Sequence, residues 1–369
     1  MTHLVYPGAL HTRFHHALGA MHLAGMAVET LKSKGHEITA AEEEAVIIAI
    51  LLHDIGHGPY SHALEHTIVE GISHEHISGL LMDNLNREFD GKLEMALQVF
   101  KNKYHKIFLH QLVSGQLDID RLDYLTRDSF FTGVSEGIVG FDRIIKMLDV
   151  AEGQLVIEVK GIYSVEKFLI ARRLMYWQVY LHKTVVAAEQ MLVKILERAK
   201  YLAAQGKKLF ATPSFSYFLN NSVTQTDFKE NPKTLELFTQ LDDYDIYTSV
   251  KVWAFEDDYI LSTLCQNLLS RKLYQVEITN ELPDQEKINE LVTAALQSYP
   301  IELADVPYFV FRDTIKNNAY RVGDGNINIL MKDGSIRDIT LASDNSNLEA
   351  LSKTVEKHIL CYIKDLKHT

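Results

Sequence analysis

Apolar residues recur at intervals of three and four from residue 14 to about residue 200, and this spacing predicts a mainly helical first half. The clearest helix is the segment AAEEEAVIIAILLHDIG, residues 40–56. Acidic residues stand in its first turn, a strongly apolar body follows, and a glycine ends it. His53 and Asp54 therefore lie at the end of a helix that is too apolar to be exposed to solvent.

From residue 154 onward the sequence pattern predicts a mixture of helices and strands. Alternation in QLVIEV predicts a strand at 154–159, and a long helix is expected from residue 164 to about 204. Pro213 and Pro232 stand among polar residues and predict a loosely structured connection over residues 205–235. Strands separated by turn signals are then expected at 274–281, 308–313, 326–334 and 335–343, and helices at 284–298 and 347–366.

These patterns predict a mainly α domain in residues 1–205, followed by a smaller α+β region of unknown role in residues 206–369. The length of 369 residues fits about two domains, and a hydrophobic content of 47% is enough for a sizeable core. Two cysteines, Cys265 and Cys361, are too few for a disulfide framework and favour a reducing compartment, the cytoplasm. No run approaches the roughly 18 apolar residues that would span a bilayer, which argues against secretion and membrane insertion.

The charge distribution narrows the class of partner. Thirty-seven Lys and Arg against 49 Asp and Glu give a net charge of −12, which argues against nucleic acid or an anionic membrane as a partner. Residues 160–200 are an exception, with eight Lys or Arg against three Glu. They form a local basic patch that could meet an anionic substrate. Most of the 17 histidines precede residue 80, which points to the first quarter of the chain for chemistry.

Imidazole and carboxylate groups gather around the predicted end of the helix at residues 40–56. A buried carboxylate at Asp54 needs a partner. The turn GHGPYSHALEH that follows would bring His57 and His62 close to the same helix end. Upstream the candidates are His11, Arg13, His15 and His16, and downstream they are Asp118, Asp120, Asp123 and Asp128. This set of ligands suits Mn, Fe, Ni, Zn or Mg.

A second group of candidates lies on one face of a predicted helix at 117–128. Apolar residues occupy the other face. A solvated polar face is one interpretation. The other interpretation is a surface that binds the substrate, with an aspartate that chelates, a tyrosine that stacks, and Arg121 to neutralise phosphate. The polar face consists of Asp120, Asp123, Tyr124, Arg127 and Asp128.

Three motifs, YPGALHTRFHHALG, LLHDIGHGPYSH and LDIDRLDYLTRD, together resemble the HD-domain phosphohydrolases. Within that superfamily they are similar to the deoxynucleoside triphosphate triphosphohydrolases related to the sterile-alpha-motif-and-HD-domain protein. The resemblance covers residues 5–200 and implies a helical HD domain. It implies a site for one divalent metal ion at His16, His53, Asp54 and Asp120. It also implies catalytic roles for His57 and His74, and for Glu65 as the group that orients a histidine.

The same resemblance implies how a substrate is held. The segment ARRLMYWQVYLHK is similar to the family's phosphate- and sugar-contacting helix, so Arg172 is expected at the phosphates and Tyr180 at the sugar. Arginines would neutralise the phosphoryl oxygens, and tyrosines with an aspartate would hold the sugar. The expected substrate-binding residues are Arg13, His62, Arg121, Tyr124, Asp128, Arg172 and Tyr180.

The predicted function is metal-dependent hydrolysis of deoxynucleoside triphosphates to nucleoside and tripolyphosphate by a homo-oligomer. Another HD nucleotidase or phosphodiesterase, and a regulatory module that binds nucleotide without turnover, stay open as alternatives. A remote alternative is a zinc protease, because His62, Glu65 and His66 spell H-x-x-E-H.

The chain departs from its relatives at two places that bear on base recognition. Relatives carry a segment before the YPGA-like motif, with a Gln-Leu pair against the base, whereas here five residues precede Tyr6. Leu181 also stands where the relatives often have a polar residue. Apolar contacts discriminate poorly between similar ligands, so weak base preference is expected. A true start upstream of Met1 is the alternative.

Overall fold

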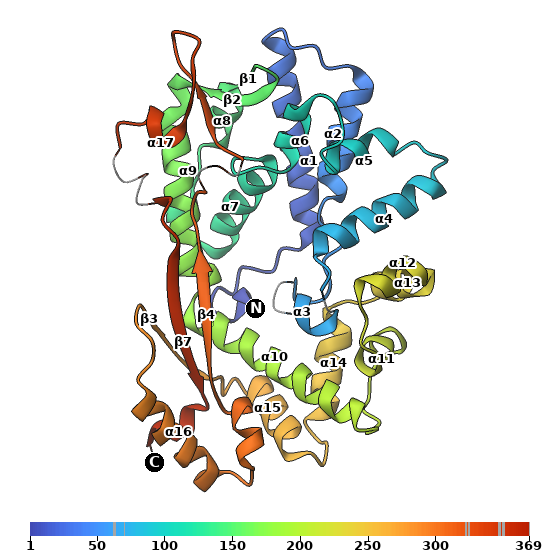
Figure 1. Cartoon of the computed structure of the whole chain (residues 1–369), viewed down its shortest axis with the longest axis vertical. Helices are drawn as coiled ribbons and strands as arrows, with labels where there is room; N and C mark the ends of the chain where they lie inside the picture. Colours follow the sequence, from blue (N-terminus) through green and yellow to red (C-terminus); the bar gives the residue numbers. More distant parts are fainter. Residues whose placement is uncertain are drawn as a thin grey trace.

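The computed structural model describes residues 1–61, 64–69, 71–321, 323, 325–345, 348 and 351–368. It confirms a mainly helical fold in which strands are concentrated toward the C-terminal end (Figure 1). The helices of the first half are α1 (Arg13–Ser33), α2 (Ala40–Leu52), α3 (Glu65–Ile68), α4 (His74–Glu88), α5 (Glu94–Phe100), α6 (Ile107–Val113), α7 (Ile119–Thr132), α8 (Phe141–Met147), α9 (Ile162–Met175) and α10 (Lys183–Ala204). Those of the second half are α11 (Pro213–Asn220), α12 (Gln225–Glu230), α13 (Pro232–Thr239), α14 (Asp243–Trp253), α15 (Tyr259–Leu269), α16 (Gln285–Ser298) and α17 (Ile339–Ala342).

Two sheets complete the fold. One has the order β1-β2-β5-β6 and the other the order β3-β7-β4. In the second sheet β7 lies in the middle, with Cys361 opposite Val276 on one side and Phe311 on the other. The strands are β1 (Leu148–Ala151), β2 (Gln154–Glu158), β3 (Gln275–Thr279), β4 (Val310–Asn317), β5 (Asn328–Leu330), β6 (Ile336–Asp338) and β7 (Val355–Tyr362).

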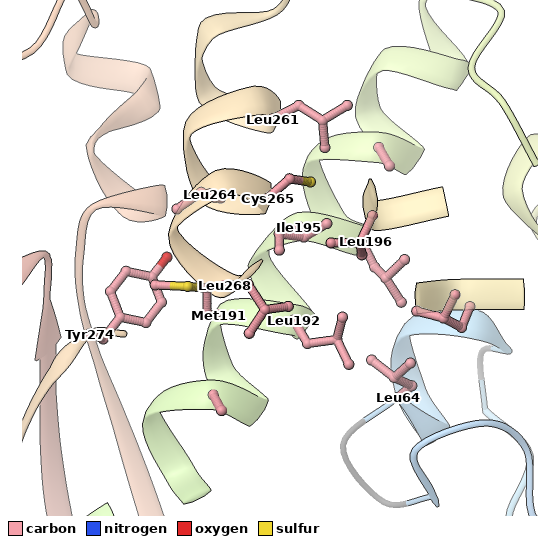
Figure 2. Close-up of a cluster of buried hydrophobic side chains, with 14 of the residues drawn as sticks. Leu64, Met191, Leu192, Ile195, Leu196, Leu261, Leu264, Cys265, Leu268 and Tyr274 are labelled. Atoms are coloured by element: carbon pink, nitrogen blue, oxygen red, sulfur yellow. The ribbon is translucent and has the colours of Figure 1, made fainter. Parts of the chain in front are cut away.

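The buried apolar residues form two cores. The first lies among α1, α2 and α5 to α9, and it also takes in buried residues from 319 to 351. The second lies around α10 and α15, whose leucines and isoleucines face each other in Figure 2, and it extends to β3, β4 and β7. Both cores draw residues from either side of residue 205, so the predicted division of the chain there stays a prediction. The long strands β4 and β7 run side by side along one side of the molecule in Figure 1, toward the end where α16 lies.

The expected helix at 347–366 is wrong over residues 355–362, which form the strand β7. Its apolar residues repeat at spacings that fit a helix, yet those at 359–362 are consecutive, as in a strand that is buried on both faces. Pairing on both edges, with β3 and β4, satisfies the backbone groups of β7 and decides between the two patterns. Similarly, residues 339–342 of the expected strand at 335–343 form the short helix α17.

Two further expectations need correction. The long helix expected at 164–204 is interrupted by a π-helical turn at Tyr176–Tyr180, after which His182 begins α10 as its N-cap. The loose connection expected at 205–235 is largely helical. Pro213 and Pro232 do not mark loops there, since each occupies the first turn of a helix, where proline is well tolerated.

Within the described residues no helix is both long and apolar enough to cross a membrane. Cys265 and Cys361 are both buried free thiols.

Candidate metal centre and active site

Three helix ends bring the predicted metal ligands together. Thr12 caps α1 in a capping box with His15, which places His16 one turn into the helix. Asp118 caps α7 by accepting from the backbone N–H of Arg121 at 2.8 Å. Asp120 therefore stands in the first turn of α7.

The third helix end is that of α2, which carries His53 as its C-cap and Asp54 directly after it. Nδ1 of His53 donates to the carbonyl oxygen of Ile50 at 2.6 Å, which leaves Nε2 as the ring nitrogen with a free lone pair. That Nε2 is buried, and it has no hydrogen-bond partner among the residues that the structure describes. An orphaned buried nitrogen of this kind fits a metal ligand.

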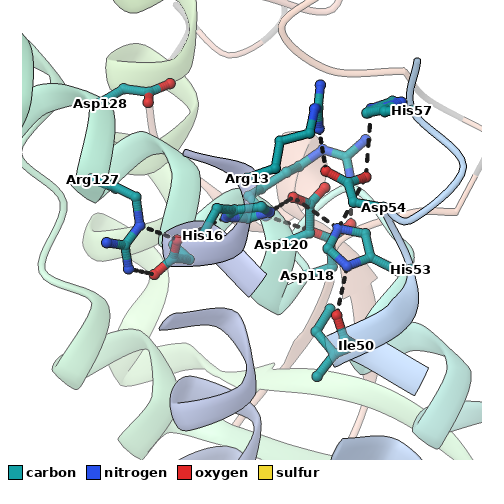
Figure 3. Close-up of polar contacts among 12 residues, drawn as sticks. Arg13, His16, Ile50, His53, Asp54, His57, Asp118, Asp120, Arg127 and Asp128 are labelled. Atoms are coloured by element: carbon teal, nitrogen blue, oxygen red, sulfur yellow. Dashed lines mark hydrogen bonds and ion pairs between the residues drawn. The ribbon is translucent and has the colours of Figure 1, made fainter. Parts of the chain in front are cut away.

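The donor atoms converge on one point, as Figure 3 shows. Among the described residues, His16, His53 and Asp120 each offer one ligand atom, and these atoms lie within 4.8 Å of one another. Nε2 of His16 is 3.1 Å from Oδ1 of Asp120, and Nε2 of His53 is 3.5 Å from the same oxygen. Oδ1 of Asp54 lies 3.3 Å from Nε2 of His53. Ligands about 2.1 Å from one ion stand about 3.0 to 3.4 Å apart, so His16, His53 and Asp120 fit a divalent metal, and Asp54 adjoins them through His53.

The electrostatics of the centre favour a cation. Burial opposes the charged form of His16, but the carboxylates of Asp120 and Asp123 outweigh it and raise the pKa of His16 to about 10. Burial likewise opposes the charge of Asp120, but the neighbouring imidazoles of His16 and His53 lower its pKa well below the usual value. Burial also opposes ionisation of Asp54, yet its pKa is lowered by His53 and Arg13. The carboxylates of Asp54 and Asp120 thus stay ionised at neutral pH.

Asp123 holds His16 in place. Its Oδ2 contacts Nδ1 of His16 at 2.7 Å, and Arg127 binds both of its oxygens at 2.8 Å. A carboxylate behind a ligating histidine fixes the ring and its tautomer. Gly19 on α1 makes room for this pair, because a Cβ there would lie 2.0 Å from Oδ1 of Asp123.

Asp54 links the centre to the predicted catalytic groups. It forms an ion pair with Arg13, whose Nε donates to Oγ of Ser61 at 3.0 Å. Nε2 of His57 lies 3.6 Å from Oδ1 of Asp54. The rings of His57 and His74 stand 3.9 Å apart between centroids.

Gly56 allows this approach of the two histidines. A Cβ at Gly56 would lie 2.2 Å from the carbonyl oxygen of His74, and its N–H donates to Oγ of Ser78 at 2.9 Å. The loop after α2 therefore packs directly against the first turn of α4.

A cleft of about 720 Å³ opens beside the centre, and every predicted substrate residue whose side chain is described lines it. Asp128 is held on both oxygens, by Tyr180 at 2.5 Å and by Nε2 of His11 at 2.8 Å. Burial and the neighbouring Asp128 keep the pKa of Tyr180 well above its usual value, so its hydroxyl remains a donor. The predicted substrate residues in the cleft are Arg13, Arg121, Tyr124, Asp128, Arg172 and Tyr180.

Three predicted residues lie outside the described part of the structure, wholly or with their side chains. His62 lies outside the described residues. Glu65 and His66 belong to α3, but their side chains lie outside the description as well. The orienting role of Glu65 and the protease alternative stay predictions.

Comparisons with known proteins identify the family of the chain. A model of the HD domain matches residues 13–128, and a model of the HD associated region matches residues 139–210. The protein YwfO of Bacillus subtilis is 32% identical over 380 residues, which cover 99% of this chain and 84% of YwfO. A crystal structure of a phosphohydrolase from Bacteroides thetaiotaomicron is 55% identical, with a TM-score of 0.93 over 98% of this chain and 90% of that one. The chain belongs to the HD-domain phosphohydrolase family.

HD domains bind a divalent metal, and membership of the HD-domain phosphohydrolase family supports a hydrolase. A more distant relative is the deoxynucleoside triphosphate triphosphohydrolase SAMHD1 homolog of Dictyostelium discoideum. It is 26% identical over 284 residues, which cover 71% of this chain and 54% of that protein. Homo-oligomerisation stays a prediction.

Sequence reasoning did not assign roles to several residues of the site. Asp123 and Arg127 were placed on the polar face of their helix, without a role behind His16. His11 was grouped with the upstream histidines, without its contact to Asp128. Such roles depend on contacts between residues that are more than a hundred positions apart in the sequence. The polar face of residues 117–128 was the one sequence feature that indicated Asp123 and Arg127.

Proposed function

We propose that this protein is a metal-dependent phosphohydrolase that converts deoxynucleoside triphosphates to deoxynucleosides and tripolyphosphate. The observation that carries the proposal is the convergence of His16, His53 and Asp120, with Asp54 next to His53, beside a cleft lined with arginines and tyrosines. The name of the Dictyostelium relative supports the choice of substrate.

The arginines would receive the phosphates. Arg13, Arg121 and Arg172 enter the cleft from α1, α7 and α9 and can stabilise negative charge that develops on the phosphoryl oxygens. When bound by the four ligands, a divalent metal would supply Lewis-acid activation of a phosphoryl oxygen and of the attacking water.

His57 and His74 would handle the proton. Their contacting rings stand at the cleft, next to Asp54. In the proposed roles one histidine donates a proton to the leaving 5′ oxygen of the deoxynucleoside, a contribution typical of general acids.

The sugar would lie against Tyr124, Asp128 and Tyr180. Tyr180 and His11 fix the carboxylate of Asp128, so it is a preorganised acceptor for a sugar hydroxyl. A ribose with an added 2′ hydroxyl would need extra room at this wall.

The experiment is to identify the products by ³¹P NMR. The purified protein is incubated separately with Mn²⁺, Mg²⁺, Co²⁺ and Ni²⁺ and with each of the four deoxynucleoside triphosphates. After the metal is removed with a chelator, the proposal predicts the ³¹P signals of tripolyphosphate, and chromatography should show a free deoxynucleoside. Pyrophosphate or orthophosphate as the first product would instead indicate another nucleotidase. Absence of turnover with every metal would indicate a binding module.

A further inference from the structure

A second cleft, of about 610 Å³, lies on the far side of the wall formed by Arg121, Arg172 and Tyr176. These three residues line both clefts. The remaining walls come from α6 and the loop after it, from β2, and from the connection between β4 and β5. The predicted function does not use this cleft.

The second cleft is basic although the chain is acidic. Its described lining residues include four Lys or Arg and no Asp or Glu, whereas the whole chain carries −12. Lys316 pairs with Glu356 at 3.2 Å, and Arg121 pairs with Asp118. Within the described part of the chain, no ion pair involves Arg172, whose Nη1 donates to the neutral carbonyl oxygen of Ala319 at 3.1 Å.

Buried polar atoms without partners concentrate in the residues that line this cleft. Nε of Arg121, Nε of Arg172 and Oδ1 of Asn318 are all buried, and none has a hydrogen-bond partner within the described residues. Buried N–H groups in proteins are nearly always hydrogen-bonded, to protein, water or ligand. Two guanidinium donors without a protein partner, beside a basic cleft, are thus available to an anionic ligand.

We propose that the second cleft binds an anion with two or more phosphate groups, and that this ligand shares Arg121 and Arg172 with the active site. Arginine recognises phosphate through pairs of N–H donors. The cleft also has amide side chains and an apolar wall, formed in part by Leu155 and Ile157. The volume leaves room for a nucleoside on the phosphates. The inference does not depend on which phosphate ester the active site cleaves.

The shared arginines would couple the two clefts. Arg172 contacts Ala319 in the β4–β5 connection, and Gln116 holds the same connection by accepting from the N–H of Arg321 at 2.7 Å. A ligand in the second cleft that engages the guanidinium of Arg172 would change the position of that group in the active site. Linkage then requires substrate and ligand to alter each other's affinity by the same factor.

The test is isothermal titration of the metal-loaded protein with inorganic tripolyphosphate, which the proposed reaction does not consume. Asn318→Asp places a carboxylate in the second cleft at nearly unchanged volume. Asn267→Asp, on α15 and outside both clefts, is the matched control for the added charge. Lys316→Gln is a second cleft variant that is safe for folding, because the lysine side chain is 65% exposed.

The proposal predicts two tripolyphosphate sites per chain in the wild type and in Asn267→Asp. In Asn318→Asp one of them should weaken about ten- to a hundredfold, and Lys316→Gln should weaken the same site less. Inhibition of turnover by tripolyphosphate should be mixed in the wild type and purely competitive in Asn318→Asp. A single site of equal affinity in all four proteins, or inhibition that is purely competitive throughout, would overturn the proposal.

Two further titrations separate the sources of the phosphate. A deoxynucleoside α,β-imidotriphosphate that binds the second site more than tenfold tighter than tripolyphosphate would identify a nucleotide as the ligand. Equal affinity would identify an inorganic polyphosphate. Equal binding by a deoxynucleoside without phosphate would contradict recognition of the anion and overturn the proposal.

Discussion

At the scale of single residues, contacts to the two histidines determine which ring nitrogen each offers to a metal. His53 offers Nε2 because its Nδ1 donates a hydrogen bond to the carbonyl oxygen of Ile50, and His16 offers Nε2 because Asp123 contacts Nδ1. The resemblance carried by three motifs predicted the ligand set, and the structure brings His16, His53 and Asp120 of that set together. The role of Asp123 could not be predicted, because it depends on where a helix 107 residues away comes to lie.

Replacing Asp123 should therefore weaken metal binding without removing a ligand. In Asp123→Asn the ring of His16 loses a charged partner, and metal affinity should fall about tenfold to a hundredfold. Titration with Mn²⁺ in a calorimeter measures it. Asp83→Asn removes an exposed pair with Lys101 and serves as the control, which should bind metal like the wild type. Equal affinity of Asp123→Asn and the wild type would show that Asp123 does not support the ligand.

At the scale of helices and strands, local signals determined the elements that end at the site. The acidic start and apolar body of α2 predicted its end near His53, and capping residues place α1 and α7. The strand β7 could not be predicted in this way, since its neighbours β3 and β4 come from more than 37 residues earlier in the chain. Long-range pairing overrode a local helical spacing.

The contact between the loop after α2 and the first turn of α4 should control catalysis through His57 and His74. Gly56→Ala would force the backbone of His74 away, because the added Cβ meets its carbonyl oxygen at 2.2 Å. We expect a loss of about 1 to 3 kcal/mol in the free energy of unfolding. The kcat should fall at least tenfold while the metal content stays unchanged.

Gly79→Ala, inside α4, is the matched control, because its Cβ would meet only ordinary contacts at 3.6 Å and beyond. Its kcat should equal that of the wild type. If Gly56→Ala keeps a normal kcat at full metal loading, the close approach of the two histidines is not needed for turnover.

The capping box of α2 should make the free energy of unfolding depend on pH in the acidic range. Burial opposes the charge of Glu42, but Lys106, Thr39 and Tyr104 outweigh it and lower the pKa of Glu42 to about 2. A carboxyl with a lowered folded-state pKa stabilises the protein above its unfolded pKa, which is near 4.5. That contribution disappears as the pH falls toward 2.

Glu42→Gln should thus be less stable than the wild type at pH 7, by about 2 kcal/mol. The difference should shrink between about pH 4.5 and 2. Urea denaturation across this range measures the free energy of unfolding. Glu44→Gln, which is exposed in the same turn, should follow the wild-type curve. A constant difference at all pH values would mean that the charge of Glu42 is not involved.

At the scale of the whole molecule, the first core supports the metal centre and both clefts adjoin it. The helices α1, α2 and α7 that carry the ligands all contribute to this core. The C-terminal segment returns to it through residues 319–351, and Arg172 contacts that segment at Ala319. The C-terminal part of the chain therefore adjoins the site, which the pattern of the sequence alone did not predict.

The most direct test of the account is the metal content of the purified protein, measured by plasma mass spectrometry beside turnover of a deoxynucleoside triphosphate. The wild type should hold one divalent ion per chain. Asp120→Asn should lose the ion and its turnover together, while circular dichroism shows an intact fold. An Asp120→Asn protein that keeps a full equivalent of metal and the wild-type rate would contradict the assignment of the metal centre to His16, His53, Asp54 and Asp120.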